Sequence, residues 1–324
     1  MQFMLDIRIS SPEPLIAYTD TILVVGSCFT EHIGGRLARL KFSVLQNPHG
    51  ILFDPLSVAK SLESYIENKQ YNADDLIMLN EVWQSWQHHS AFSGVDQEKV
   101  IQKMNASQQA AHQFLKQADW MIITLGSSFF YQLLDQAMPV ANCHRAPASW
   151  FQKRMLDIDE TVIALDRCIE RLFQFNPRLK VIFTVSPVRH IRDGVIENNR
   201  SKARLIESVH QLADKHKQVY YFPAYELVID VLRDYRFYDI DLVHPNYAAT
   251  EYVFSKFSDS YIEPESRKLM DDLKEIITAF NHKPFQPSTQ AHRQFLTNYL
   301  KKIQQFKQKN PHVDLSEEIR YFSS

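Results

Sequence analysis

The sequence predicts an α/β fold in which helices cover both faces of a parallel sheet. Apolar runs of strand length recur along the 324 residues, and helical patterns lie between them. Each run is short and continuously apolar, which is typical of a strand buried on both faces. The expected strands are Thr21–Val25, Phe42–Leu45, Trp120–Leu125, Val181–Val185 and Val219–Phe222. We therefore expect a three-layer α/β/α sandwich of the doubly wound type, with a five-stranded parallel sheet.

Helices are expected between these strands. A first helix should begin near Thr30, just after the first strand. Asp54 and Pro55 have the character of an N-cap and a first helical residue, and apolar residues then recur at helical spacing to Ile66. Similar apolar stripes run through Val100–Phe114, Val162–Phe173 and Ala203–Leu212.

Two segments depart from the alternation of strands and helices. Asp74–Gly94 places tryptophans and histidines among polar residues, and we expect an insertion near 74–94 that lies over the edge of the sheet. After Pro264 the pattern indicates a mixed helix over Ser266–Phe280, a proline-containing link and an amphipathic helix around Phe295–Phe306. The expected organisation is an α/β domain over residues 1–263 and a C-terminal helical extension, 264–324, packed on it. A membrane- or partner-binding basic helix is the alternative for the last segment.

Composition excludes several classes of protein. Lys and Arg number 36 against 38 Asp and Glu, so a net charge of −2 offers no field to attract nucleic acid or an anionic membrane. Hydrophobic residues make up 45%, enough for a large core, and no apolar run reaches the roughly 18 residues needed to span a bilayer. The start of the chain lacks the pattern of a signal peptide, so we expect a cytoplasmic protein. The oligomeric state is not predictable from the sequence.

No metal or cofactor is expected from the sequence. The three cysteines, Cys28, Cys143 and Cys168, are too few for a disulfide framework or a zinc cage. His88 and His89 are adjacent rather than at metal-ligand spacing. The stretch Gly26-Ser27-Cys28-Phe29-Thr30 has neither the dinucleotide fingerprint nor the Gly-Lys-Ser/Thr of a phosphate-binding loop.

The positions of the glycines indicate where a ligand would bind. Only seven are present, and Gly26, Gly50 and Gly126 follow the first three strands. The carboxyl ends of parallel strands share one edge of the sheet, and in doubly wound folds ligands bind at that edge. We therefore expect a site there.

Three side chains could perform chemistry at this edge. Ser27 lies at the turn into the first helix. A hydroxyl at this position can serve as a nucleophile or as the N-cap of the helix, and position alone favours neither role. Asp241 and His244 follow the fifth strand, and the carboxylate can reach the imidazole and leave Nε2 free as a base. Pro245 favours an extended backbone at His244. A polar surface loop is the alternative interpretation of the pair.

Taken together, these motifs resemble those of the SGNH hydrolase superfamily, and Gly26-Ser27-Cys28-Phe29 resembles the motif of the GSCFA family within it. The similarity extends along nearly the whole chain. It includes Asn47-Pro48-His49-Gly50-Ile51-Leu52, Thr124-Leu125-Gly126, Ser186-Pro187-Val188-Arg189-His190 and Asp241-Leu242-Val243-His244-Pro245. The resemblance implies a flavodoxin-like sheet and a serine hydrolase in which Ser27 attacks an ester, His244 accepts its proton and Asp241 stabilises the imidazolium.

The resemblance also implies an oxyanion hole made of the Ser27 N–H, the Gly50 N–H and an Asn side chain. That Asn is missing, because the chain has Gly126-Ser127-Ser128 at this point. A lost oxyanion donor can cost about 10²–10³ in turnover, so another group must replace it or activity is weak. The candidate replacements are Ser128, His88, His89, Ser90, Asn142 and His144.

Three further residues at the same edge need an interpretation. Cys28 adjoins Ser27, and only one of the two can face His244; the resemblance favours Ser27, with Cys28 packed inward. Arg189 and His190 follow the fourth strand, where they could contact substrate, although a structural salt bridge is as plausible.

Two functions are compatible with these observations. The first is a serine-dependent ester hydrolase, or an acyltransferase with the same acyl-enzyme, acting on a small or carbohydrate-linked acyl ester. The second is a weakly active or inactive binding module for an acylated glycan or related ligand.

Overall fold

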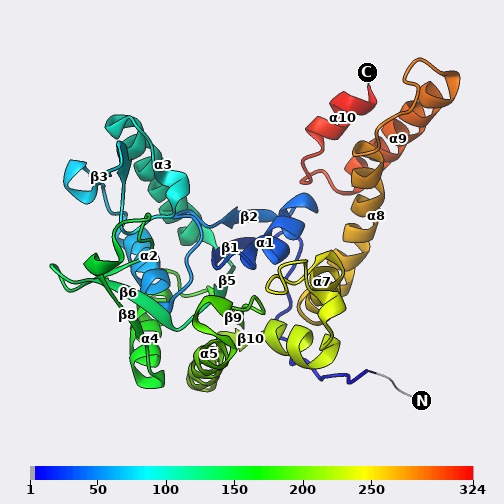
Figure 1. Ribbon diagram of the computed structural model, residues 1–324. Coiled ribbons are helices and arrows are strands. Elements are labelled where there is room, and N and C mark those ends of the chain that lie inside the picture. The colour runs from blue at the N-terminus through cyan, green and yellow to red at the C-terminus, as the bar shows by residue number, and fades with distance from the viewer. Residues whose placement is uncertain (1–3, 324) are drawn as a thin grey trace.

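A five-stranded parallel sheet forms the centre of the computed structural model, which describes residues 4–323 (Figure 1). The strands are β1 (Thr21–Gly26), β2 (Ser43–Gln46), β5 (Trp120–Leu125), β9 (Lys180–Val185) and β10 (Val219–Tyr221). Their order is β10-β9-β5-β1-β2, and every neighbouring pair is parallel. The winding therefore reverses between β1 and β5, which confirms the predicted doubly wound fold.

Helices cover both faces of this sheet. The α-helices of residues 4–323 are α1 (Thr30–Arg39), α2 (Pro55–Glu67), α3 (Gln97–Gln117), α4 (Ile158–Phe175), α5 (Val195–Lys215), α6 (Ala224–Glu226), α7 (Tyr247–Tyr261), α8 (Pro264–Phe280), α9 (Gln290–Lys309) and α10 (Ser316–Phe322). Alternate β1 side chains enter different cores: Leu23 packs with α2 to α5, and Ile22 packs with α1, α7 and α8. The expected three layers are present.

The predicted helices are found, with longer bounds than their apolar stripes indicated. Asp54 caps α2 as expected, because its Oδ1 accepts the Ser57 N–H at 2.9 Å. Asp96 and Asp157 cap α3 and α4 in the same way. Polar first and last turns lie outside the apolar stripe of a helix, so periodicity locates the buried middle better than the ends.

The segment near 74–94 contains a small antiparallel hairpin of β3 (Ile77–Leu79) and β4 (Val82–Gln84). A second antiparallel sheet was not predicted. It has the order β7-β6-β8 and consists of β6 (Phe129–Leu133), β7 (Met138–Val140) and β8 (Phe151–Met155). Strand β8 reads Phe-Gln-Lys-Arg-Met, and such a polar, half-exposed strand lacks the apolar run that identifies a central strand.

The C-terminal helices α8, α9 and α10 project from one side of the sandwich (Figure 1). Met270, Leu273 and Ile303 of these helices are buried in the same core as Ile16 and Phe42. Helix α10 was not predicted, because its seven residues are too few to show a period. No helix among residues 4–323 is both long and apolar enough to cross a bilayer.

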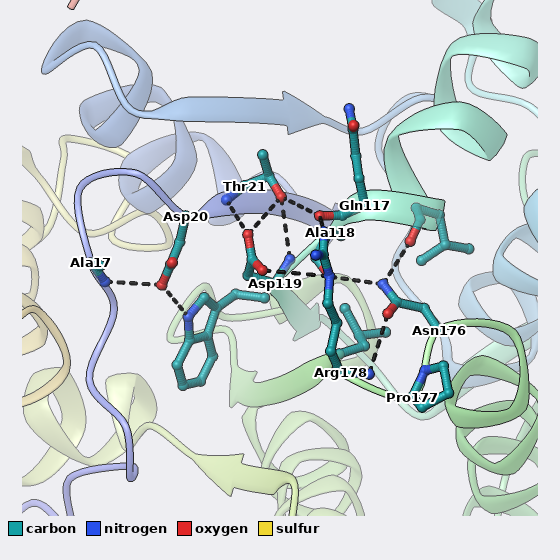
Figure 2. Close-up of polar contacts among 12 residues, drawn as sticks. Ala17, Asp20, Thr21, Gln117, Ala118, Asp119, Asn176, Pro177 and Arg178 are labelled. Carbon is teal, nitrogen blue, oxygen red and sulfur yellow. Dashed lines mark hydrogen bonds and ion pairs between the residues drawn. The ribbon is translucent and has the colours of Figure 1, made fainter. Parts of the chain in front are cut away.

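The amino ends of the strands are joined by a polar network (Figure 2). Asp119 Oδ2 accepts from the N–H and the hydroxyl of Thr21, which links β5 to β1. Asp20 accepts from the Trp120 indole at 2.8 Å. Asn176 donates to the carbonyls of Leu115 and Ala118. These polar groups form hydrogen bonds within the fold, so the amino edge of the sheet has a structural role.

Candidate active site

The carboxyl edge of the sheet is shaped by the turn after β1. Gly26 has φ +138°, and a Cβ there would lie 2.1 Å from the Thr124 carbonyl oxygen, so only glycine fits. Asn47 Oδ1 accepts the Gly26 N–H at 3.0 Å, and Asn47 Nδ2 donates to Thr30 Oγ1 at 2.8 Å. The Leu52 N–H donates to the Gly26 carbonyl. The segment after β2 therefore fixes the turn that carries Ser27 and Cys28.

The structure reverses the expected exposure of Ser27 and Cys28. Ser27 is 1% exposed, and its Oγ has no hydrogen-bond partner among residues 4–323. Cys28, expected to pack inward, is partly exposed. The cause is the backbone: the Ser27 N–H donates to the Thr124 carbonyl at 2.9 Å, so Ser27 still belongs to the β1–β5 ladder. The Ser27 side chain is buried beside Gly126, whose would-be Cβ lies 3.1 Å from the Ser27 Cβ, whereas Cys28 begins the helical turn.

Asp241 and His244 form the predicted contact. His244 Nδ1 lies 2.6 Å from Asp241 Oδ2, and both side chains are about half exposed, at 49% and 46%. Asp241 Oδ1 accepts the N–H groups of His244 and Val243. The hydrogen bonds from the backbone N–H and the ring of His244, followed by that from Val243, lower the pKa of Asp241 to about 2. The carboxylate thus stays ionised and favours the Nδ1–H tautomer, which leaves Nε2 as a base.

Several contacts hold the Asp241–His244 loop at the sheet edge. The Asp239 N–H donates to the His244 carbonyl, and the Arg189 N–H donates to the Val243 carbonyl. The Arg189 guanidinium stacks over the Tyr238 ring at 4.4 Å. Arg189, interpreted from sequence as a substrate contact or a salt bridge, thus anchors the loop by a cation–π contact.

The structure does not join Ser27 to His244. No hydrogen bond connects Ser27 Oγ with the imidazole in the part of the chain that is described. His244 lies instead beside His32 of α1. The pKa of His32 is lowered by burial, and then by the charges of Arg36 and His244.

The predicted oxyanion donors are already engaged. The Ser27 N–H bonds to Thr124, as described above, and the Gly50 N–H donates to the Asn47 carbonyl at 2.7 Å within a tight turn. Ser128 Oγ donates to Ser201 Oγ at 3.0 Å and is fully buried. None of the three is free to bind an oxyanion in this arrangement, so the predicted oxyanion hole is not formed.

His190 and Lys202 meet at the carbonyl oxygen of Gly126. His190 Nε2 lies 3.1 Å from it, and Lys202 Nζ lies 2.5 Å from it and 2.6 Å from the Ser186 carbonyl oxygen. Carbonyls only accept, so His190 carries its proton on Nε2. Burial lowers the pKa of Lys202 to about 7. Burial, followed by the charge of Lys202, lowers the pKa of His190 to about 4, so its imidazole is neutral near pH 7.

Lys202 was missed in the sequence, although a signal exists. It precedes Leu205 by three positions and Val209 by seven, so it lies on the apolar stripe of α5. A lysine in such a register is buried, and a buried lysine often has a shifted pKa and a function.

The remaining candidates have partners of their own. The Cβ of His89 fills the space beside Gly50, and its Nδ1 accepts the Ala91 N–H. Asn142 Oδ1 accepts the His144 N–H, and His144 is buried with Nε2 at the Ser85 carbonyl. No hydrogen bond described for residues 4–323 joins Asn142 or His144 to Ser27 or Cys28.

Two of the other proposed donors belong to the insertion. His88 is buried, with Nδ1 3.1 Å from Ser85 Oγ and its ring 4.1 Å from that of His49. Ser90 is exposed at the start of a short 3₁₀ turn. No group of side chains in the described part of the chain could hold a metal ion.

Comparisons with known proteins identify a family. The GSCFA family matches residues 21–257, and the C-terminal domain of GSCFA domain proteins matches residues 273–324. The chain matches none of the curated proteins.

Three solved structures are similar at low identity. A suspected platelet activating factor from Streptococcus pneumonia is 13% identical, with 74% of this chain and 83% of that chain covered and a TM-score of 0.40. A carbohydrate esterase of family 3 from Talaromyces cellulolyticus is 10% identical, with coverages of 79% and 99% and a TM-score of 0.37. A family 3 carbohydrate esterase from Clostridium thermocellum is 13% identical, with coverages of 80% and 99% and a TM-score of 0.31.

Proposed function

We propose that this chain, which belongs to the GSCFA family, transfers the acyl group of an ester through a covalent acyl-enzyme, as an ester hydrolase or an acyltransferase. The observation that carries the proposal is the 2.6 Å contact of Asp241 with His244 at the edge where β1 ends. An imidazole whose Nδ1–H is held by an ionised carboxylate has Nε2 available as a general base.

The chemistry follows from this pair. His244 Nε2 accepts the proton of a nucleophile on the turn after Gly26, and the nucleophile attacks the ester carbonyl carbon. The imidazolium then gives the proton to the leaving alkoxide, while Asp241 stabilises its charge. Water or a second alcohol, activated by the same base, releases the acyl group and restores the enzyme.

A substrate with a small acyl group suits this site best. Phe53 and His190 stand edge to face beside Gly126, with ring centroids 6.2 Å apart, and both flank the turn. Because His244 and Asp241 are about half exposed, the alcohol side of an ester would extend into solvent. We therefore propose a small or carbohydrate-linked acyl ester as the substrate.

A second candidate function is a binding module without turnover. The engaged N–H groups of Ser27 and Gly50 favour it, because a hydrolase needs free donors for the oxyanion. Such a module would bind an acylated glycan or related ligand and leave it intact.

Hydrolysis of p-nitrophenyl esters of increasing acyl length distinguishes the two functions. His244→Ala should lower kcat/KM about 10²–10⁴-fold, and Asp241→Asn should lower it in the same direction. His216→Ala is the matched control, since His216, directly after the last residue of α5, forms a 2.7 Å pair with Asp166 of α4. Equal rates for wild type, His244→Ala and the control would reject the enzyme and favour the binding module.

A further inference from the structure

The position of Ser27 makes it a poor nucleophile. Its side-chain oxygen is buried and has no hydrogen-bond partner among residues 4–323, and its Cβ lies 3.1 Å from the point that a Cβ on Gly126 would occupy. The hydroxyl is therefore enclosed between β1 and β5. Because this oxygen is buried, an ester carbonyl could reach it only if neighbouring residues moved.

Cys28 occupies the first position beyond the strand ladder. It is partly exposed, and the chain turns into α1 directly after it, with the Glu31 N–H donating to the Cys28 carbonyl at 3.1 Å. The N–H groups of Cys28 and Phe29 donate to no carbonyl among the hydrogen bonds described for residues 4–323. Both N–H groups favour a negative charge on the Cys28 sulfur. Because neither N–H donates to a carbonyl in the described part of the chain, both can turn to an oxyanion that forms next to that sulfur.

The charge of a buried lysine, Lys202, acts on Cys28. Lys202 is 1% exposed, and its two described hydrogen bonds go to the main-chain carbonyls of Gly126 and Ser186. Its positive charge favours the Cys28 thiolate. Because Lys202 bonds to neutral carbonyls and not to a carboxylate among residues 4–323, its positive charge is not neutralised by a partner there and can act on the Cys28 sulfur.

The periodicity of the helix places Cys28 in line with the face of α1 that lies toward His244, the proposed general base. Positions 28, 32 and 36 are four residues apart and share one face of the helical turn and α1. Arg36 on this face bonds to Glu251 and Thr250 of α7, and the charges of His244 and Asp239 act on His32. The face that begins at Cys28 therefore runs along the segment that carries His244.

We propose that Cys28, rather than Ser27, is the nucleophile of this site, with His244 as its base and the N–H groups of Cys28 and Phe29 as the oxyanion donors. This inference rests on the proposed acyl transfer. Burial, and then the charge of Glu31, raise the pKa of the Cys28 thiol, so the resting thiol keeps its proton and needs a base.

The step balances with the groups present. His244 Nε2 takes the thiol proton, sulfur bonds to the carbonyl carbon, and the ester C–O bond breaks as the alkoxide takes that proton. Water then attacks the thioester and gives a proton to His244. The C–S bond breaks, and the thiolate recovers the proton as the acid leaves.

The test uses the full chain and p-nitrophenyl acetate. Wild type, Cys28→Ala, Cys28→Ser and Ser27→Ala are compared, with Cys143→Ala as the control at the other partly exposed cysteine. We expect Cys28→Ala to lose about 10³-fold or more in kcat/KM, and Ser27→Ala and Cys143→Ala to stay within about tenfold of wild type. Peptide mapping of briefly reacted protein should place an acetyl group, labile to hydroxylamine, on Cys28.

The outcomes separate this inference from the proposed function. An acetyl group on Ser27, or Cys28→Ala activity within tenfold of wild type while His244→Ala is inactive, would overturn Cys28 and keep the acyl transfer. Equal activity of all variants, His244→Ala included, would overturn both. If no adduct accumulates, the rates of Cys28→Ala and Ser27→Ala decide. Circular dichroism confirms that each variant folds, and an acetylated Cys28 in wild type alone would support the proposal should a variant fail to fold.

Discussion

At the scale of single residues, the carboxyl edge of the sheet differs from the amino edge in how its polar groups are satisfied. At the amino edge, Asp20, Asp119 and Asn176 find partners that join the strands (Figure 2). At the carboxyl edge, Ser27 Oγ has no partner among residues 4–323 and Lys202 is buried against carbonyls. Unsatisfied and charged buried groups cost stability, so they tend to mark functional sites.

Lys202 gives a prediction about pH and stability. Burial lowers the pKa of Lys202 from 10.5 to about 7, so between these values the unfolded chain binds more protons than the folded one. Wild type should therefore gain stability relative to Lys202→Met as pH rises from 7 to 10, by at most about 1.4 kcal/mol per pH unit. Urea unfolding of both proteins at steps of pH measures the difference. Parallel stability curves would contradict a buried lysine with a lowered pKa.

The chemistry of the site was only partly predictable from single residues. The predicted Asp241–His244 contact is confirmed. It was predictable because it depends on a local spacing of three residues and the turn before Pro245. The predicted exposure of the Ser27 hydroxyl was wrong, because hydrogen bonding to β5 continues through the Ser27 N–H although β1 ends at Gly26. The Thr124 carbonyl, about a hundred positions away, decides this by accepting the Ser27 N–H.

At the scale of elements, the junction of β1 and α1 controls the site. Gly26→Ala should destabilise the protein by about 3 kcal/mol or more, because the new Cβ would lie 2.1 Å from the Thr124 oxygen at a φ of +138°. Gly35→Ala in α1 is the matched control. In the described part of the chain nothing lies within 4 Å of its would-be Cβ, so this substitution should stabilise the helix by about 0.5–1 kcal/mol. Equal effects in urea unfolding would show that the turn is not tight.

The strands that are buried on both faces were predicted most accurately. The sheet strands β1, β5 and β9 consist of continuous apolar runs, and their predicted bounds differ from the observed ones by at most one residue. Strands β6 and β8 pair with each other in a separate sheet, and their mixed polar residues give no such run. Their existence depends on tertiary pairing, which one sequence does not reveal.

At the scale of the whole molecule, the C-terminal helices and the sheet share one hydrophobic core. Ile303 of α9 is fully buried in the core that includes Ile22 and Val24 of β1. Ile303→Ala should cost about 2–5 kcal/mol and lower the single unfolding transition of the whole chain. Ile163→Ala, on the exposed side of α4 at 69%, should change stability by about 0.5 kcal/mol or less. A separate calorimetric transition that alone shifts in Ile303→Ala would mean that these helices unfold independently.

The whole-molecule topology explains why distant motifs meet. The reversal of winding between β1 and β5 opens the carboxyl edge where the turns after β1 and β5 and the Asp241–His244 loop converge. The sequence order of strands and glycines was sufficient to predict this convergence. The burial of Ser27 and the partial exposure of Cys28 were not predictable, because they depend on the backbone path through the converging loops.

Acyl transfer at this site is measured most directly by the pre-steady-state release of p-nitrophenolate from p-nitrophenyl acetate. A covalent acyl-enzyme that forms faster than it is hydrolysed predicts a burst of about one equivalent per chain in wild type, followed by slower turnover. His244→Ala should show no burst, since the nucleophile then lacks its base. A burst of the same size in both proteins, or linear release at the uncatalysed rate in wild type, would contradict acyl transfer at this edge of the sheet.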